Sequence, residues 1–221
     1  MYDLTLTFDN GPDPDVTPRV LDILAAREIR TTFFVIGEKL ADPERRRLAA
    51  RAHSEGHWIG NHTFTHTIPL GAQSGRDTAE REIGRTQDAI GDLAHQARWF
   101  RPFGGGGNLD RRLLKPSVVD YLTREKHSCV LWNSIPHDWD DPDGWTGRAL
   151  DQCSRQPWTL MVLHDLPSGA MHHLEQFIDR AAHEGARFHQ DFPLDCVPIQ
   201  SGEIARSIKP YVSSIEEGQT S

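Results

Sequence analysis

Apolar and polar positions follow two different periods along the chain. Short runs rich in β-branched and aromatic residues predict strands, and longer segments with apolar residues three or four positions apart predict helices. The predicted strands cover residues 2–8, 30–37, 57–63, 97–100, 128–133, 158–164 and 186–188. The predicted helices include residues 16–28, 42–56, 75–94, 145–155 and 171–185. Strands and helices that alternate in this way are typical of an α/β protein with a parallel sheet, and six or seven such units predict a closed or nearly closed barrel.

Length and charge narrow the function classes. A chain of 221 residues is expected to form one domain with a sizeable core. Its net charge of −8 and its pI of about 5.8 argue against non-specific binding of nucleic acid or of an anionic membrane, for which a basic patch is the usual feature. We therefore expect neither nucleic acid nor a membrane among its partners.

Cysteine usage and the start of the chain indicate a compartment. Cys129, Cys153 and Cys196 are odd in number and far apart, which fits three reduced thiols better than a disulfide framework. No charged and then apolar leader precedes Tyr2, and no apolar run reaches the length of a membrane span. These features predict a cytoplasmic protein.

Polar side chains stand where five of the predicted strands end. In chain order they are Asp9 and Asn10, His62 and His66, Arg101, Asp138 and Trp139, and His164 and Asp165. In a parallel barrel the carboxyl ends of all strands lie on one face, where such folds place their chemistry. The pattern therefore predicts that these side chains converge on one site.

Each of these side chains also has an ordinary explanation. The Asn-Gly and Gly-Pro pairs after Asp9 are turn dipeptides, Arg101 would commonly be a solvated charge, and His164 would commonly close the edge of the core. His62 and His66 are spaced i, i+4, which brings two imidazoles near enough to share a divalent ion but also arises by chance. Five polar clusters on one face are more than turns require, and the combination favours a functional site.

Five short motifs in the chain form a known set. They are TFDNGP at residues 7–12, HTFTH at 62–66, RPF at 101–103, HDW at 137–139 and VLHD at 162–165. In these motifs, and in their order, the sequence resembles the polysaccharide deacetylase (NodB-homology) family, the family four carbohydrate esterases. The resemblance extends over residues 7–165, which is most of the chain.

The resemblance implies a fold and a reaction. The fold would be a distorted (β/α)7 barrel, with the catalytic domain over residues 1–199 and a polar C-terminal appendage over residues 200–221. The reaction would be the metal-dependent removal of N-acetyl groups from an N-acetylated carbohydrate. Asn10, His62 and His66 would hold a divalent metal, with zinc as the first candidate and an open position for water.

Four side chains would carry out or support the proton transfers that the resemblance implies. Asp9 would be the general base that takes a proton from the metal-bound water. Arg101 would keep Asp9 ionised and oriented, as an adjacent cation does. His164 would be the acid that protonates the departing amine, with Asp138 as its candidate partner.

Four further residues would contact the acetamide. The backbone N–H of Phe103 would stabilise the oxyanion together with the metal. Trp139, with Val162 or Leu163, would form the wall of a small pocket for the acetyl methyl group.

The sequence departs from the family at three places. Asn10 stands where the family has an aspartate ligand, so a weaker metal site, or one completed by water, is expected. The third motif lacks a proline and a tyrosine and is followed by glycines at 104–107. Ile135 stands where the family has the aspartate that pairs with the acid, so His164 would rely on Asp138 or on nothing, and its pKa would be lower.

Two alternatives to a carbohydrate deacetylase remain from the sequence. A small-molecule amidase or deformylase could use the same scaffold, because the departures fall on the walls that choose the substrate. A catalytically weak member that binds carbohydrate is the other alternative, but binding alone does not need a base, an acid and metal ligands together.

Overall fold

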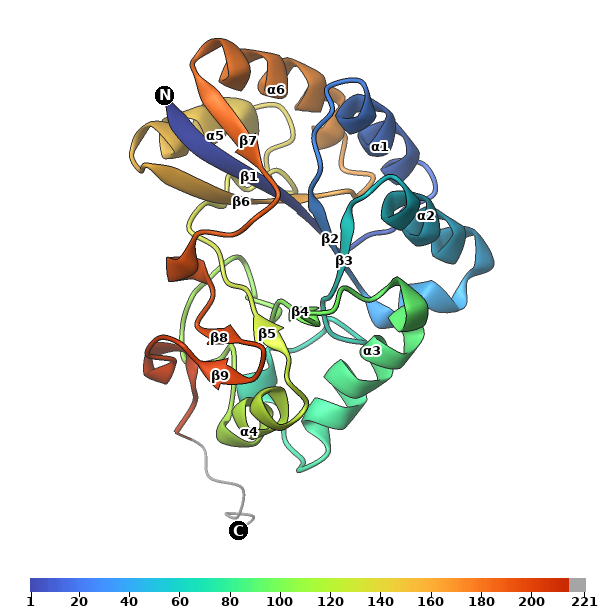
Figure 1. Cartoon of the computed structure of the whole chain (residues 1–221), viewed down its shortest axis with the longest axis vertical. Helices are drawn as coiled ribbons and strands as arrows, with labels where there is room; N and C mark the ends of the chain where they lie inside the picture. Colours follow the sequence, from blue (N-terminus) through green and yellow to red (C-terminus); the bar gives the residue numbers. More distant parts are fainter. Residues whose placement is uncertain (215–221) are drawn as a thin grey trace.

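One nine-stranded sheet organises residues 1–214, which are the residues that the computed structural model describes (Figure 1). The strands are β1 (Tyr2–Asp9), β2 (Thr32–Val35), β3 (Trp58–Asn61), β4 (Trp99–Phe100), β5 (Ser128–Cys129), β6 (Trp158–His164), β7 (Ala186–His189), β8 (Ile199–Gln200) and β9 (Glu203–Ile204). Their order is β6-β1-β2-β3-β4-β5-β8-β9, and β7 pairs with β1. The pairings among β1–β7 are parallel, whereas β8 pairs antiparallel with both β5 and β9.

The sheet curls around β1, which lies at its centre. β1 pairs with β6 from Asp3 to Asp9, with β7 through its first half and with β2 through its last three residues. The segment after β5 approaches β6 from the other side, where the Val162 N–H donates to the Ser134 carbonyl at 3.0 Å. Seven parallel strands in a curled sheet confirm the predicted distorted barrel.

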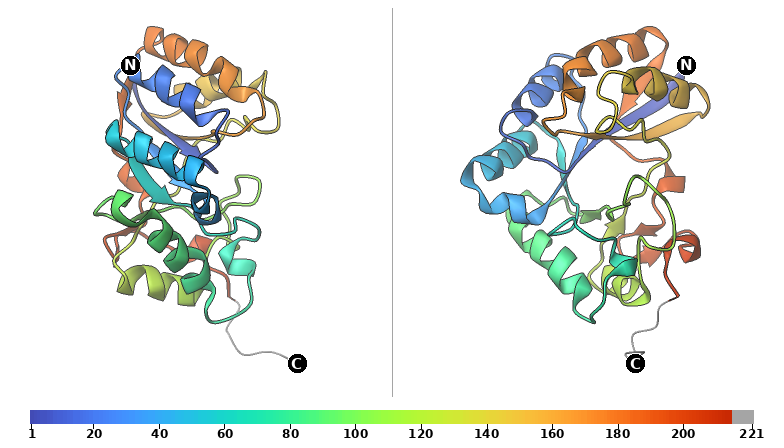
Figure 2. Two further views of the ribbon diagram at one scale, coloured as in Figure 1. Left: turned by 90° about the vertical axis from the view of Figure 1, so that its right-hand side faces the viewer. Right: turned by 180° about the vertical axis from the view of Figure 1, so that it is seen from behind.

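Within residues 1–214, six α-helices cover the outside of the curled sheet (Figures 1 and 2). They are α1 (Thr17–Ala25), α2 (Pro43–Ser54), α3 (Arg85–Ile90), α4 (Pro116–Arg124), α5 (Trp145–Ser154) and α6 (Leu174–His183). The predicted start of the helix 42–56 is confirmed, because the Asp42 side chain caps α2: it accepts from the Glu44 N–H at 2.8 Å and so satisfies a free backbone donor of the first turn. None of the helices within residues 1–214 is long and apolar enough to cross a membrane.

Two local predictions were wrong in part, and one helix was missed. The predicted helix 75–94 is present as one helical run over residues 78–93, but it begins three residues later than predicted and is π-helical over Glu80–Gly84 before the short α3. Buried Lys115 binds the carbonyl of Gly75 and the hydroxyl of Thr78 next to that start. The predicted strand 128–133 ends at Cys129, since the Leu131 N–H donates instead to the Cys196 carbonyl at 2.7 Å. Helix α4 had not been identified from the pattern.

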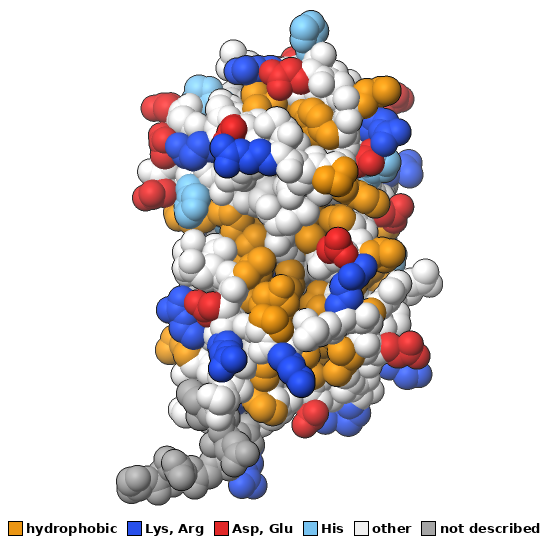
Figure 3. All heavy atoms as spheres, turned by 90° about the vertical axis from the view of Figure 1, so that its left-hand side faces the viewer, with side chains coloured by type: hydrophobic (Ala, Val, Ile, Leu, Met, Phe, Trp, Pro, Cys, Tyr) orange, Lys and Arg blue, Asp and Glu red, His pale blue; other side chains and the backbone are white. Residues whose placement is uncertain are grey.

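The two faces of each central strand have different surroundings. The largest core cluster lies between the sheet and the helices, and it contains Phe8, Trp145, Leu163 and Phe177. Alternate residues on β1 and β6 point away from this core, toward the inside of the curl. On the outer surface, acidic and basic side chains are interspersed over the face shown in Figure 3.

The described part of the predicted appendage extends the sheet beyond β5 through the short strands β8 and β9. Gln200 belongs to β8, and Ile208 is buried in the core cluster that contains Cys129 and Ile199. The predicted boundary after residue 199 stays a prediction, and residues 215–221 lie outside the described residues.

Candidate active site

A cavity of about 250 Å³ lies at the carboxyl ends of the parallel strands. This is the end of the sheet that faces the viewer in the right-hand view of Figure 2, where the long connecting loops gather. Five polar side chains line the cavity: Asp9, Asn10, His62, His66 and His164. The other lining residues are Pro102, Phe103, Gly104, Gly105, Gly106, Gly107, Trp132, Ile135, Trp139, Val162 and Leu166. The predicted convergence of strand-end residues on one site is present in the structure.

A buried ion pair fixes Asp9. The Arg101 guanidinium is fully buried and donates to Asp9 Oδ1 at 2.8 Å and to Thr7 Oγ1 at 2.7 Å. Its plane lies over the Phe34 ring, 4.1 Å from the ring centre. Burial lowers the pKa of Arg101, and the charge of Asp9 opposes that shift. Arg101 is therefore a counter-ion inside the protein, and the explanation as a solvated surface charge is wrong.

The backbone orients His62 toward the cavity. Its Nδ1 lies 2.8 Å from the Arg101 carbonyl oxygen, so Nδ1 carries the proton and Nε2 presents a lone pair. That Nε2 lies 3.1 Å from His66 Nε2 and 3.4 Å from Asp9 Oδ2. Burial is the main cause that lowers the pKa of both His62 and His66 to about 3. Both imidazoles are therefore neutral at physiological pH, which is the form that binds metals.

The donor atoms fit a divalent metal ion. Two nitrogen ligands of a tetrahedral zinc ion lie about 3.3 Å apart, close to the separation of the two Nε2 atoms. The Asn10 Oδ1 atom is buried and has no hydrogen-bond partner among the described residues, as expected for an oxygen that serves as a metal ligand. Within residues 1–214 no three His, Cys, Asp or Glu side chains are grouped to hold a metal, so the third donor would be the amide of Asn10 or a water molecule.

Lys39 and Asp165 support the turn that carries Asn10. Asn10 has a φ of 75°, which Asn tolerates better than most residues, and its carbonyl accepts from Lys39 Nζ at 2.7 Å. Gly11 packs directly on the Asp165 carboxyl group, where a Cβ atom would lie 2.2 Å from an oxygen. Asp165 is fully buried, accepts from the Thr17 hydroxyl, and has its pKa raised to about 7 by burial. Asp165 had been predicted to lie near the site but had no role assigned, and Lys39 had not been predicted, because only the fold brings its side chain to the turn.

The loop that carries His66 is held by Glu82, another residue that had not been predicted. Glu82 lies in the π-helical segment and is buried, and its carboxylate accepts from the Phe64 N–H at 3.0 Å, the Thr65 N–H at 2.9 Å and the Thr65 hydroxyl at 2.9 Å. The loop needs such support because His66 has a φ of 51°, in the left-handed region. π-Helical segments are frequent at functional sites.

His164 is paired with Asp138 on the other side of the cavity. Asp138 is fully buried, its Oδ1 lies 2.8 Å from His164 Nδ1, and its Oδ2 accepts from the His164 N–H at 2.8 Å. Burial alone would lower the pKa of His164, but the hydrogen bond and charge of Asp138 outweigh it and the pKa is raised. The expected lowering of this pKa was wrong, because Asp138 takes the place of the missing aspartate at Ile135.

Of the residues predicted for the pocket wall, Trp139 and Val162 line the cavity, and Leu163, the alternative to Val162, does not. The Phe103 ring lies 4.0 Å from the His66 ring, and the Trp139 ring meets the His164 ring edge-on at 4.7 Å. Val162 lines the cavity, whereas Leu163 is fully buried in the core under the helices. Neighbouring residues of a strand point to opposite faces, so only one of the two can reach the cavity.

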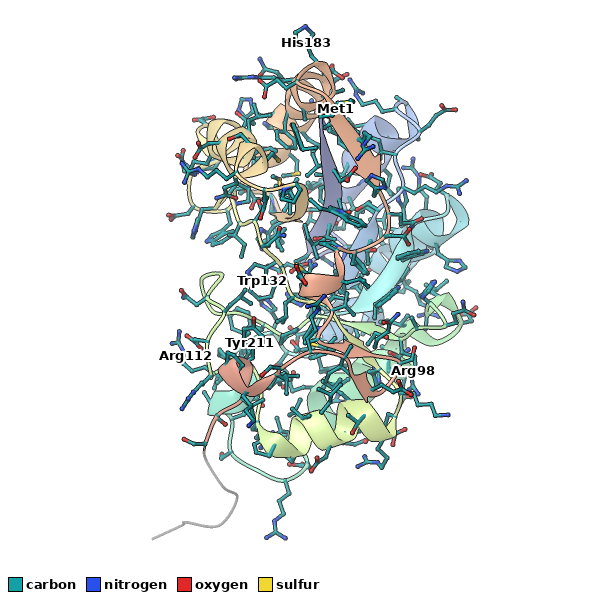
Figure 4. All side chains as sticks on the ribbon, turned by 60° about the vertical axis from the view of Figure 1, so that its left-hand side comes forward. Met1, Arg98, Arg112, Trp132, His183 and Tyr211 are labelled. Carbon is teal, nitrogen blue, oxygen red and sulfur yellow. The ribbon has the colours of Figure 1, made fainter. Side chains whose placement is uncertain are left out.

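A glycine turn and a tryptophan that had not been predicted complete the wall. Gly105, Gly106 and Gly107 all have positive φ values, and the Asn108 N–H donates to the Gly104 carbonyl at 3.0 Å. The turn rests on Trp132, whose indole N–H donates to the Gly107 carbonyl at 3.1 Å. Trp132 is labelled in Figure 4, beside the loop that leads to Arg112.

Comparisons with known proteins found similar sequences and structures. The family model described as polysaccharide deacetylase matches residues 3–117. A chitooligosaccharide deacetylase of Rhizobium leguminosarum is 35% identical over 73% of this chain and 67% of its own length. A peptidoglycan-N-acetylglucosamine deacetylase of Bacillus cereus is 30% identical over 84% of this chain and 66% of its own length. The chain thus spans about two thirds of the length of these relatives.

A solved structure has the same fold. The family 4 carbohydrate esterase from Streptomyces lividans, in complex with acetate, superposes with a TM-score of 0.71 at 25% identity. The match covers 89% of this chain and 96% of that one.

Proposed function

The chain belongs to the polysaccharide deacetylase family, and on that premise we propose that it is a metal-dependent hydrolase that removes N-acetyl groups from an N-acetylated carbohydrate. The enzyme class is a hydrolase of carbon–nitrogen bonds other than peptide bonds. The metal and the roles of single residues are our proposal.

One observation carries the proposal. A carboxylate held by a buried cation, two neutral imidazoles 3.1 Å apart and a third imidazole with a raised pKa line one cavity. Amide hydrolysis needs these groups together, because an activated water must lose a proton and a poor amine leaving group must gain one. Binding of a carbohydrate without turnover needs none of them.

His62, His66 and Asn10 would hold the metal. When bound, a divalent metal makes a coordinated water more acidic and polarises the amide carbonyl. Membership of the family suggests such an ion, and zinc is our candidate because imidazole nitrogen is among its preferred ligands.

The side chains of this protein would move the protons. Asp9, oriented by Arg101, takes the proton of the attacking water, since Asp9 Oδ2 faces the cavity beside His62. His164, kept protonated by Asp138, donates a proton to the departing nitrogen. The Phe103 N–H stabilises the oxyanion, and Trp139 and Val162 contact the acyl group.

A second candidate is hydrolysis of a smaller amide or formamide. Its support is that the cavity wall apart from the five polar side chains is mostly apolar. The weak carbohydrate-binding alternative rests on Asn10 alone, because a neutral third ligand holds a cation less firmly than a carboxylate.

A substrate screen tests the proposal. The zinc-loaded protein is incubated with N-acetylated chitooligomers, small acetamides and formamides, and release of free amine is measured. We expect amine release from the chitooligomers, and release that is about 10²–10⁴-fold slower from the Asp9→Asn variant. Release only from small amides would favour the second candidate, and no release from any substrate would contradict both.

A further inference from the structure

The loop after β5 runs beside β6 without forming a regular strand. Three alternate N–H groups of β6 donate to it: that of Leu160 to Asn133 Oδ1 at 2.7 Å, that of Val162 to the Ser134 carbonyl at 3.0 Å and that of His164 to Asp138 Oδ2 at 2.8 Å. Two of the three acceptors are side chains, so the position of the Asp138 carboxylate depends on the path of this loop.

Two side chains of α5 bind the first half of the loop. Gln152 accepts from the Ser134 hydroxyl at 2.6 Å and donates to the Ile135 carbonyl at 2.9 Å. Arg148 Nε donates to the Pro136 carbonyl at 2.8 Å. Three consecutive residues of the loop are thus tied to one helix, and a helix supports a site more firmly than a loop does.

The second half of the loop is tied to the same helix. Arg148 also donates to Asp141 Oδ2 at 2.6 Å, and the Asp141 N–H donates to the His137 carbonyl at 3.1 Å. His137 lies directly before Asp138 and has a φ of 56°, in the left-handed region, which is retained only where the surroundings hold it. The contacts of α5 on both sides of Asp138 provide that support.

We propose that Arg148 and Gln152 are positioning residues for the acid: they hold the loop so that the Asp138 carboxylate stays hydrogen-bonded to the His164 ring. That His164 is the acid belongs to the proposed function, on which this inference rests. Neither Arg148 nor Gln152 lines the cavity, so both act through Asp138. The charge-assisted hydrogen bond of 2.8 Å between Asp138 Oδ1 and His164 Nδ1 weakens when its geometry is lost.

The pKa of His164 is the quantity that reports this role. Burial lowers this pKa, but the hydrogen bond and the charge of Asp138 outweigh burial. The charges of Asp9 and Asp165 also raise it and stay in place in the test, and the two imidazoles across the cavity are neutral at physiological pH. A loop that is held less firmly loses part of the effect of Asp138, so the pKa of His164 should fall. An NMR titration of the full chain with zinc measures it, and the His164→Gln variant identifies the ring signals.

Arg148→Met and Gln152→Met are the test variants, because Met has a similar length and makes none of these hydrogen bonds. In both, the pKa of the acid histidine should fall toward its value in Asp138→Asn, which removes the whole charge. Arg155→Met is the matched control. Arg155 directly follows α5 and pairs with Asp151 at 2.6 Å, so its loss should leave the pKa at the value of the natural chain.

Activity and conservative variants distinguish positioning from a merely structural role. In the amine-release assay the alkaline limb of the kcat–pH profile should move to lower pH in the Met variants, with KM unchanged. Arg148→Lys and Gln152→Glu each keep one of the two hydrogen bonds and should lower the pKa by a smaller amount. Circular dichroism verifies the fold, and an unfolded Met variant is replaced by its conservative counterpart.

The outcomes separate the inference from the proposed function. A pKa of His164 that is the same in the Arg148 and Gln152 variants as in the natural chain would overturn the inference, and amine release by the natural chain would leave the proposed function intact. An equal fall in Arg155→Met would also overturn it, because the effect would not depend on the loop. If the pKa falls as expected but no substrate yields amine, the inference stands and the proposed function fails.

Discussion

The two sides of the cavity are held by different kinds of contact. On the side of β1 and β3, hydrogen bonds from buried groups hold the reacting side chains, as Arg101 holds Asp9 and Glu82 holds the loop of His66. On the side that follows β4 and β5, glycines pack on Trp132 and Ile135 through apolar contacts. Under the proposed function, the type of reaction would depend on the polar side and the choice of substrate on the apolar side.

This comparison predicts that a change on the polar side lowers kcat by a similar factor for every substrate. Asp9→Asn should reduce kcat by about 10²–10⁴, because a general base contributes that much to the rate. Zinc binding and the relative rates for different substrates should stay nearly unchanged. Steady-state assays and zinc analysis measure the two effects. Asp3→Asn is the matched control, since Asp3 lies at the other end of β1 and pairs with Arg187. A near-normal kcat in Asp9→Asn would remove Asp9 from the mechanism.

Glu82 tests whether the support of the polar side sets metal affinity. Glu82→Ala leaves the Phe64 and Thr65 N–H groups without their acceptor, so zinc should bind about 10–100-fold more weakly. Glu80→Ala, an exposed position of the same π-helical segment, should bind zinc as the natural chain does. Chelator competition gives both affinities, and equal values would show that the loop of His66 is stable without Glu82.

Substitution of Asn10 tests whether a stronger ligand on the polar side raises the zinc affinity. Asn10→Asp should tighten zinc about tenfold or more, because a carboxylate adds an opposite charge beside the ion. The sign of the effect on kcat is open, since the added charge also weakens the pull of the metal on the carbonyl. The measurement is a chelator titration of both proteins at one pH. Unchanged affinity would mean that residue 10 does not contact the metal and that its role is the turn alone.

Substitution of Asp138 should shift the pH dependence of kcat. The pKa of His164 is raised by Asp138, so the protonated acid persists to higher pH than it otherwise would. Removing the charge in Asp138→Asn lowers that pKa, and the alkaline limb of the kcat–pH profile should move to lower pH. A limb that stays in place would indicate that His164 is not the acid.

The sequence allowed the polar side of the site to be predicted further than the apolar side. Asp9, His62 and His164 end predicted strands, and parallel strands bring their ends to one face, so local patterns were sufficient. Leu163 was wrong as a wall residue because two neighbouring strand residues had been treated as equivalent. Glu82 and Trp132 were missed because their contacts depend on how distant segments pack, and neither carries a signal in its own neighbourhood.

The same reasoning explains the errors in the fold. The parallel strands were found because their apolar runs are continuous, and β6 was predicted with its observed ends. Strand β5 was predicted too long, since the apolar residues after Cys129 are buried without strand pairing. Burial of an apolar run was visible in the sequence, but the partners of its backbone were not.

The most direct test of the central claim is the metal dependence of amine release. The protein is stripped with a chelator, and hydrolysis of N-acetylated chitooligomers is measured before and after zinc is restored. We predict that stripping abolishes amine release and that zinc restores it, while a His62→Ala variant stays inactive with zinc added. Amine release that persists in the stripped protein would contradict the account.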